Sequence, residues 1–140
     1  MIKELKELLA QANSEYKYYY ATKKEQNQNN EELPFGSKYV YIEEFNQGFF
    51  SIQNGFVNKT TRANIYFSKI VDLQTLTAEK REDVREEIEK EIIRPFINLY
   101  NKSDYFYPLT NFSFYQTLPQ FNNGEVSIML QFDCKEREKC

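Results

Sequence analysis

The sequence of 140 residues contains no histidine and no tryptophan. Histidine is the side chain that most often serves as general base or metal ligand, and its charge changes near neutral pH. Without it the chain cannot form a Ser–His or Cys–His nucleophilic pair, nor any zinc site that needs imidazole. The composition therefore points away from the commonest kinds of enzyme and towards a protein that works through its contacts.

Cysteine and glycine are also scarce. The two cysteines, Cys134 and Cys140, lie in a charged C-terminal segment. They are too few for a disulfide framework or a four-ligand zinc site, and we interpret them as free thiols in a reducing cytoplasm. The four glycines stand apart, each beside a turn, so there is no glycine-rich loop for a phosphate group. We expect no cofactor and no metal ion.

Long apolar runs and an excess of positive charge are missing as well. No stretch approaches the roughly 20 apolar residues that a membrane span needs. Charged residues interrupt the N-terminal apolar patch, unlike in a signal peptide. The net charge is −3, so no overall positive field attracts nucleic acid or an anionic membrane. We expect no membrane association and no specific nucleic-acid binding, although lysine adjoins aromatic residues at 17–20.

The spacing of the apolar residues predicts helices and strands in separate groups. Helices are predicted over 2–20 and 77–101, with Thr77 as the N-cap of the second. Pro95 is expected to kink or break that second helix, because proline has no backbone N–H. The polar stretch 21–38 is predicted to be a loop. The predicted strands are 38–45, 49–54, 61–71, 111–118 and 125–133.

Two pairs of these strands are predicted to form hairpins. The strands at 38–45 and 49–54 are joined by a turn at Gly48, and the last two strands by a turn at 119–124. Phe112 and Phe114 are expected to point inward from their strand. Asn54-Gly55 is a further strong turn signal, placed before the strand at 61–71.

This order predicts a single α+β domain over residues 1–140. It consists of an N-terminal helix, a three-stranded antiparallel group, a long central helix and a C-terminal β-hairpin. One mostly antiparallel sheet is covered by the helices. Residues 135–140 form a charged tail without apolar content.

Carboxylates are the only remaining candidates for acid–base chemistry. Glu43 lies in a predicted strand and would be noteworthy if it faced the core with Tyr39, Tyr41 and Phe45. We favour the alternatives, in which Val40 and Ile42 face the core or Glu43 lies at the rim of the sheet. The acidic helix at 79–91 is interpreted as a face exposed to solvent. We therefore assign no catalytic residue.

Aromatic residues are the main surplus, with 12 Phe and 11 Tyr. Several lie at a helix end or in a loop, where the core of a monomer cannot easily use them all. Tyrosine and phenylalanine are enriched at protein–protein interfaces. The candidate interface residues are Tyr16, Tyr18, Tyr19, Tyr20, Tyr105, Phe106 and Tyr107.

The element order is similar to that of one known group of proteins. The matching features are the amphipathic helix at 2–20, the strand group at 38–71, the acidic helix at 79–102 and a final hairpin ending in NNGEVSIMLQFDC at 122–134. In this order the sequence resembles the tail-terminator or tail-completion proteins of tailed bacteriophages. Those proteins are small subunits of the ring at the head–tail junction.

The resemblance implies a non-enzymatic structural protein of the virion, assembled in the cytoplasm of a bacterial host. Such a subunit forms a cyclic homo-oligomer and contacts neighbouring portal, connector or tail proteins. The sheet and the segments 21–38 and 55–60 would then be the subunit contacts. The alternative, from another class, is a small intracellular binding protein, such as a phage-encoded inhibitor of a host factor or a binder of single-stranded nucleic acid. An enzyme that uses carboxylates alone is the least favoured interpretation.

Overall fold

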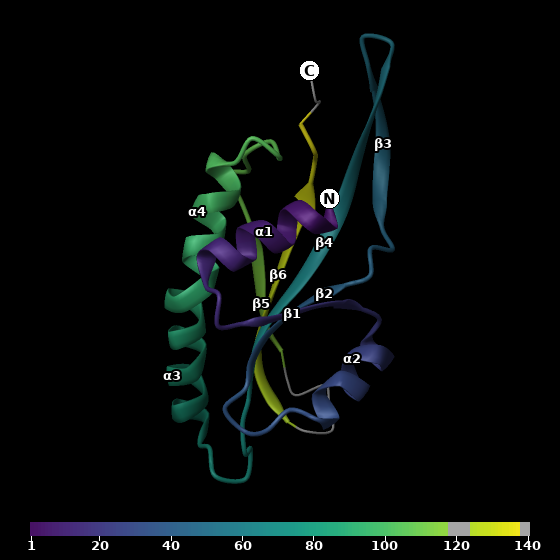
Figure 1. Cartoon of the computed structure of the whole chain (residues 1–140). Coiled ribbons are helices and arrows are strands. Elements are labelled where there is room, and N and C mark those ends of the chain that lie inside the picture. The colour runs from purple at the N-terminus through teal and green to yellow at the C-terminus, as the bar shows by residue number, and fades with distance from the viewer. Residues whose placement is uncertain (118–123, 138–140) are drawn as a thin grey trace.

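The computed structural model describes residues 1–117 and 124–137 and has an α+β fold (Figure 1). A six-stranded, mostly antiparallel mixed sheet carries helices on both faces. The predicted fold class, with its N-terminal helix, long central helix and C-terminal strands, is confirmed. In chain order the elements are α1 (Ile2–Ala12), β1 (Lys17–Ala21), α2 (Lys23–Glu31), β2 (Lys38–Glu43), β3 (Gly48–Gln53), β4 (Phe56–Ile70), α3 (Ala78–Ile88), a π-helical turn (Glu89–Ile93), α4 (Arg94–Lys102), β5 (Ser113–Thr117) and β6 (Glu125–Cys134).

The sheet is built around the long strand β4. The strand order is β1-β2-β4-β6-β5, in which only β1 and β2 run parallel. β3 pairs with the first half of β4, on the same side as β2 and in line with it. The predicted hairpin between 38–45 and 49–54 is therefore wrong. Asn54 and Gly55, with φ of 52° and 79°, make the tight turn instead, because a two-residue turn of this kind needs positive φ at both positions.

The N-terminal helix is shorter than predicted. α1 ends at Ala12, and the chain then enters the edge strand β1 rather than continuing as a helix to residue 20. In this strand Tyr18 and Tyr20 pack on the face covered by α1 and α4, while Tyr19 packs on the opposite face. Pairing with β2 gives the backbone of β1 hydrogen-bond partners, and it lets the tyrosines pack against apolar residues on both faces of the sheet. This tertiary gain overrides the weak helical spacing of the tyrosines.

The predicted loop at 21–38 is also wrong, because it contains the nine-residue helix α2. Thr22 and Glu25 form a capping box at its start. Its buried side is polar: Gln26 donates to Asn30 at 2.9 Å, and Asn30 donates to the Tyr39 hydroxyl at 2.9 Å. A helix that meets the sheet through amides has no apolar period, so hydrophobic spacing could not indicate it.

The central helix runs from Ala78 to Lys102 without a break, and Thr77 caps it as predicted. Pro95 is accommodated by the π-helical turn at Glu89–Ile93, which ends where the Arg94 N–H donates to the Glu89 carbonyl. The expected break is absent. The wider π-helical turn changes the backbone hydrogen-bond pattern just before Pro95, and the helix continues beyond it. One end of the helix packs on α1 and the whole helix covers one sheet face (Figure 1).

The C-terminal strands β5 and β6 pair antiparallel, as predicted. The predicted turn at 119–124 lies, except for Gly124, outside the described residues, and so does Cys140. The larger core lies between the sheet and the helices α1, α3 and α4. Its largest buried members include Phe67, Phe96, Tyr100 and Phe106.

Candidate functional site

The β3–β4 hairpin extends beyond the body of the sheet as a two-stranded arm (Figure 1). The last residue pair between β4 and β6 is Thr61–Cys134. Beyond it, residues 49–60, called the arm below, have ladder partners only within the arm among the described residues. Six residues of strand span roughly 20 Å. The arm is therefore long enough to reach past the surface of its own domain.

The arm exposes apolar side chains that a soluble monomer normally buries. Ile52 lies directly opposite Val57, and Phe50 lies opposite Lys59, so these residues share one face. Phe50, Ile52 and Val57 are exposed by 71%, 78% and 67%. We call these three side chains the apolar face of the arm. Contiguous exposed apolar patches are a mark of interaction sites on soluble proteins.

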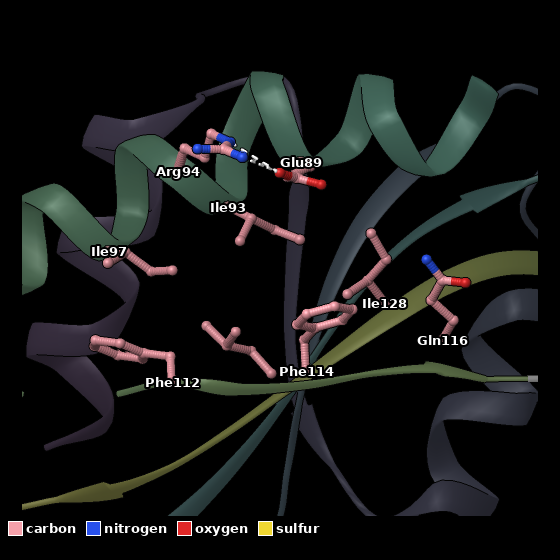
Figure 2. A pocket seen from close by; sticks show the side chains of 9 residues that line it. Glu89, Ile93, Arg94, Ile97, Phe112, Phe114, Gln116 and Ile128 are labelled. Carbon is pink, nitrogen blue, oxygen red and sulfur yellow. Dashed lines mark hydrogen bonds and ion pairs between the residues drawn. The ribbon is translucent and has the colours of Figure 1, made fainter. Parts of the chain in front are cut away.

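A groove lies between the central helix and the edge strand β5 (Figure 2). It encloses about 310 Å³. Glu89 and Arg94, paired at 2.6 Å, lie at its rim. The residues that line it are Glu89, Ile93, Arg94, Ile97, Phe112, Phe114, Gln116, Ile128 and Leu130. It is therefore an apolar groove with a small charged border.

Phe114 in the wall of this groove departs from the prediction. It was expected to point inward to the core, yet it is 64% exposed. It does lie on the helix-covered side of the sheet, opposite Leu130, but the central helix does not extend over it. β5 pairs only with β6 in the described part of the chain, so its outer edge has no ladder partner there. An open edge beside an apolar groove is a surface suited to another strand.

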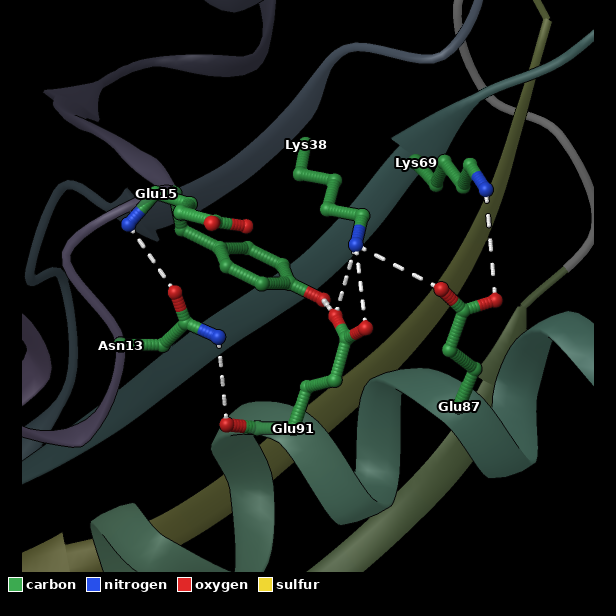
Figure 3. Close-up of polar contacts among 7 residues, drawn as sticks. Asn13, Glu15, Lys38, Lys69, Glu87 and Glu91 are labelled. Carbon is green, nitrogen blue, oxygen red and sulfur yellow. Dashed lines mark hydrogen bonds and ion pairs between the residues drawn. The ribbon is translucent and has the colours of Figure 1, made fainter.

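A separate polar cluster joins the central helix to the sheet (Figure 3). Lys38 contacts Glu91 at 2.9 Å and Glu87 at 3.4 Å, and the Tyr16 hydroxyl donates to Glu91 at 3.1 Å. Burial raises the pKa of Glu91, but hydrogen bonds from Lys38 and Tyr16 outweigh it and leave that pKa below its usual value. The carboxylate is therefore charged and accepts hydrogen bonds from Lys38 and Tyr16. It holds the central helix to the sheet, which is a structural role rather than that of a general base.

Two of the predicted interface residues lie in the core. Tyr16 is 1% exposed and Phe106 is fully buried, the latter stacked on Tyr100 with ring centroids 4.8 Å apart. For these two residues, the expectation that the monomer's core cannot use them is wrong. The reason is that the Tyr16 ring enters the core while its hydroxyl reaches Glu91, and Phe106 is held by a β-bridge to Glu136.

The other five predicted interface residues are half-buried or exposed. Tyr18 donates to the Asn13 carbonyl at 3.2 Å, and the Tyr20 hydroxyl accepts from the Phe45 N–H at 3.1 Å. Tyr19 lies edge-on to Tyr39 within the sheet. Tyr105 and Tyr107 are 39% and 40% exposed, and Tyr105 donates to Glu7 at 2.7 Å. These contacts are all within the chain, and none of the five residues lies in the arm or lines the groove.

The most exposed apolar residues were not singled out by the sequence. They are Phe35, Phe49, Phe50, Ile52, Phe56, Val57 and Phe114. Alternation around Asn54-Gly55 indicates a hairpin, but the same pattern occurs in a hairpin buried on one side. What distinguishes the arm from a core hairpin is a tertiary property: none of the described helices or strands covers its apolar face.

The remaining titratable candidates are Glu43 and Cys134, and neither belongs to a reactive group of side chains among the described residues. Glu43 is the last residue of β2 and accepts a hydrogen bond from the Tyr66 hydroxyl at 3.3 Å. Cys134 is 1% exposed, and its burial raises the pKa of the thiol to about 12. Within residues 1–117 and 124–137, no three His, Cys, Asp or Glu side chains gather as metal ligands would.

Comparison with protein-family models and with curated proteins finds no matching family and no matching relative. None of the described helices is long and apolar enough to cross a membrane. The arm and the groove are therefore the features on which a function has to be argued.

Proposed function

We propose that this protein is a non-enzymatic structural subunit of a phage virion, which assembles with copies of itself into a ring at the head–tail junction. The observation that supports the proposal is the arm. A two-stranded ribbon that leaves the body with Phe50, Ile52 and Val57 in water is incomplete in a monomer. A neighbour that covers it supplies the missing burial.

The energetic argument for association is direct. Fully burying one Val, Ile or Phe side chain is worth about 1.5–3 kcal/mol. The arm exposes Phe49 and Phe56 on its second face as well, at 54% and 70%. Burial of the residues on either face would offset part of the entropy cost of association.

The place of the ring in a virion comes from the resemblance in element order to tail-terminator and tail-completion proteins. In that setting the partners are further copies of this chain and the adjoining portal, connector or tail proteins. The polar cluster around Glu91 supports this role, because a rigid helix–sheet body is what a ring subunit needs to hold its contact surfaces in place.

Mass spectrometry of purified phage particles tests the proposal. We expect this chain among the particle proteins in a fixed ratio to the portal protein. Light scattering on the purified protein is expected to show a concentration-dependent oligomer. Absence from the particles, together with tight one-to-one binding to a host protein or to single-stranded nucleic acid, would support the alternative of an intracellular binding protein.

A further inference from the structure

We infer that the arm of one copy docks into the groove of the next copy, so that arm and groove are the two halves of a single interface. This inference rests on the proposed self-assembly and names the contact that would carry it. The occupant of the groove is thus a second copy of this chain.

The two surfaces match in chemistry. The arm presents Phe50, Ile52 and Val57 on one face, and the groove is walled by Ile93, Ile97, Phe112 and Phe114 (Figure 2). Both halves are exposed in the same chain, so docking removes two apolar surfaces from water at once. Phe114 is 64% exposed, so it is the groove residue that would lose the most exposed apolar surface on docking.

The rim of the groove offers the arm one possible ion pair. Lys59 is the only charged residue of the arm, and it lies opposite Phe50 on the apolar face. The central helix that forms one wall of the groove has more acidic than basic residues over 79–91. Glu89 at the rim already pairs with Arg94 yet remains 41% exposed, so a lysine can approach it from outside. An arm entering this groove brings Lys59 towards a border that carries one acidic and one basic side chain, of which only Glu89 can attract it.

The backbones are complementary as well. β3 pairs only with β4 and β5 only with β6 in the described residues, so each has an outer edge without a ladder partner. The strands are of similar length, six and five residues. When the arm lies in the groove, it lies beside β5, where its backbone can continue the sheet across the subunit boundary.

In Figure 1 the arm extends to the upper right, whereas the central helix and β5, which line the groove, lie to the left of it. The contact is therefore between two different surfaces on two different copies, which makes it head-to-tail. Contacts of this kind close into rings when the rotation between neighbours allows it. A contact between separate arm and groove surfaces is therefore compatible with the proposed ring.

Cross-linking between two singly substituted chains tests the docking. One chain carries Ile52→Cys, the other carries Gln116→Cys at the groove rim, and both carry Cys140→Ser to remove the tail thiol. A short bis-maleimide is added to the mixture. The matched control is Gln53→Cys, which lies one residue away on the opposite face of the arm. We expect at least tenfold more heterodimer with Ile52→Cys than with Gln53→Cys.

A second measurement keeps the test independent of the cross-linker. Ile52→Asp is expected to weaken self-association at least tenfold in sedimentation, while Gln53→Asp leaves it within about twofold. Circular dichroism shows whether each variant remains folded. Since both substitutions lie on the exposed arm, neither removes a core contact.

The outcomes separate the docking from the proposed function. If the wild-type chain associates but the two cysteine positions cross-link equally or not at all, the docking is wrong and the ring function stands. If the chain does not associate even at its highest soluble concentration and gives no cross-link, the docking is wrong and the self-assembly falls with it.

Discussion

The side-chain amide of Asn13 donates to the backbone carbonyl of Glu91 at 3.4 Å (Figure 3). In a regular α-helix that carbonyl accepts from the N–H of the residue four positions later, which is Pro95 and has none. Asn13, just after the end of α1, donates to this carbonyl inside the π-helical turn, close to the proline. It ties the N-terminal helix to the π-helical turn of the central one.

Asn13→Ala is expected to lower the free energy of unfolding by about 1–2 kcal/mol, because a partly buried carbonyl loses its donor. Urea unfolding measures the effect. The same substitution in a Pro95→Ala background is expected to cost less, since alanine can supply a backbone N–H. An equal loss of stability in both backgrounds would show that the Asn13 hydrogen bond to the Glu91 carbonyl does not compensate for the missing N–H of Pro95.

Glu91→Gln is expected to make the free energy of unfolding depend less on pH in the acidic range. The folded-state pKa of Glu91 is lowered, so its carboxylate stabilises the fold above its unfolded pKa of about 4.3 and that contribution is lost as pH falls through the folded-state value. Unfolding at pH 7 and pH 3 measures it. The loss on acidification is expected to be smaller for Glu91→Gln than for the wild type. Glu86→Gln, an exposed position on the same helix, is the control and is expected to keep the wild-type profile.

Tyr39→Phe is expected to cost about 1–3 kcal/mol, because it removes the acceptor of the buried Asn30 amide. The loss is expected to appear first in α2, which contacts the sheet through this polar network. Hydrogen exchange of the α2 amides is the measurement. Tyr115→Phe, whose ring is 49% exposed, is the control, and equal exchange in the two variants would contradict the role of the Tyr39 hydroxyl.

The triple variant Phe50→Ser, Ile52→Ser, Val57→Thr is expected to change the free energy of unfolding by no more than about 0.5 kcal/mol per site. Those side chains are already in water, so the folded monomer gains little from them. Phe96→Ala, in the core, is expected to cost about 3–5 kcal/mol. Thermal and urea unfolding of both proteins check this. A large loss in the triple variant would mean that the arm packs on its own domain.

Cys134 in a Cys140→Ser chain is expected to resist alkylation in the folded state. Burial raises the pKa of its thiol to about 12, so almost no thiolate is present at pH 8, and reagent access is blocked. Iodoacetamide labelling followed by mass spectrometry is the measurement. Rapid labelling before unfolding would contradict the buried position, while labelling in denaturant is the positive control.

The regular periodic segments could be predicted, and the exceptions have specific causes. The central helix was predictable from Val84, Ile88 and Ile92 at helical spacing and from the Thr77 cap. α2 could not be, because it meets the sheet through Gln26 and Asn30 rather than through apolar residues. Likewise, Tyr18–Tyr20 satisfy a strand as well as a weak helical face, and only pairing with β2 decides between the two.

The positions of the exposed apolar residues could not be predicted from the sequence. An excess of aromatic residues indicated contacts beyond one core, yet Tyr16 and Phe106 proved to be core residues. The exposed apolar residues lie at 49–57 and 114 instead. The buried and the exposed residues are of the same apolar and aromatic types, so composition cannot tell which of them lie at the surface.

The sequence by itself determined the absence of histidine, the long central helix with its Thr77 cap, the C-terminal strands and the turn at Asn54-Gly55. The tertiary structure alone decided which apolar faces meet another element. β4 is longer than its neighbours, so its pairing with β6 ends at Thr61, and beyond that point the hairpin pairs only with itself in the described part of the chain. Burial depends on what lies opposite a side chain, and that is a property of the assembled chain, not of the segment that carries it.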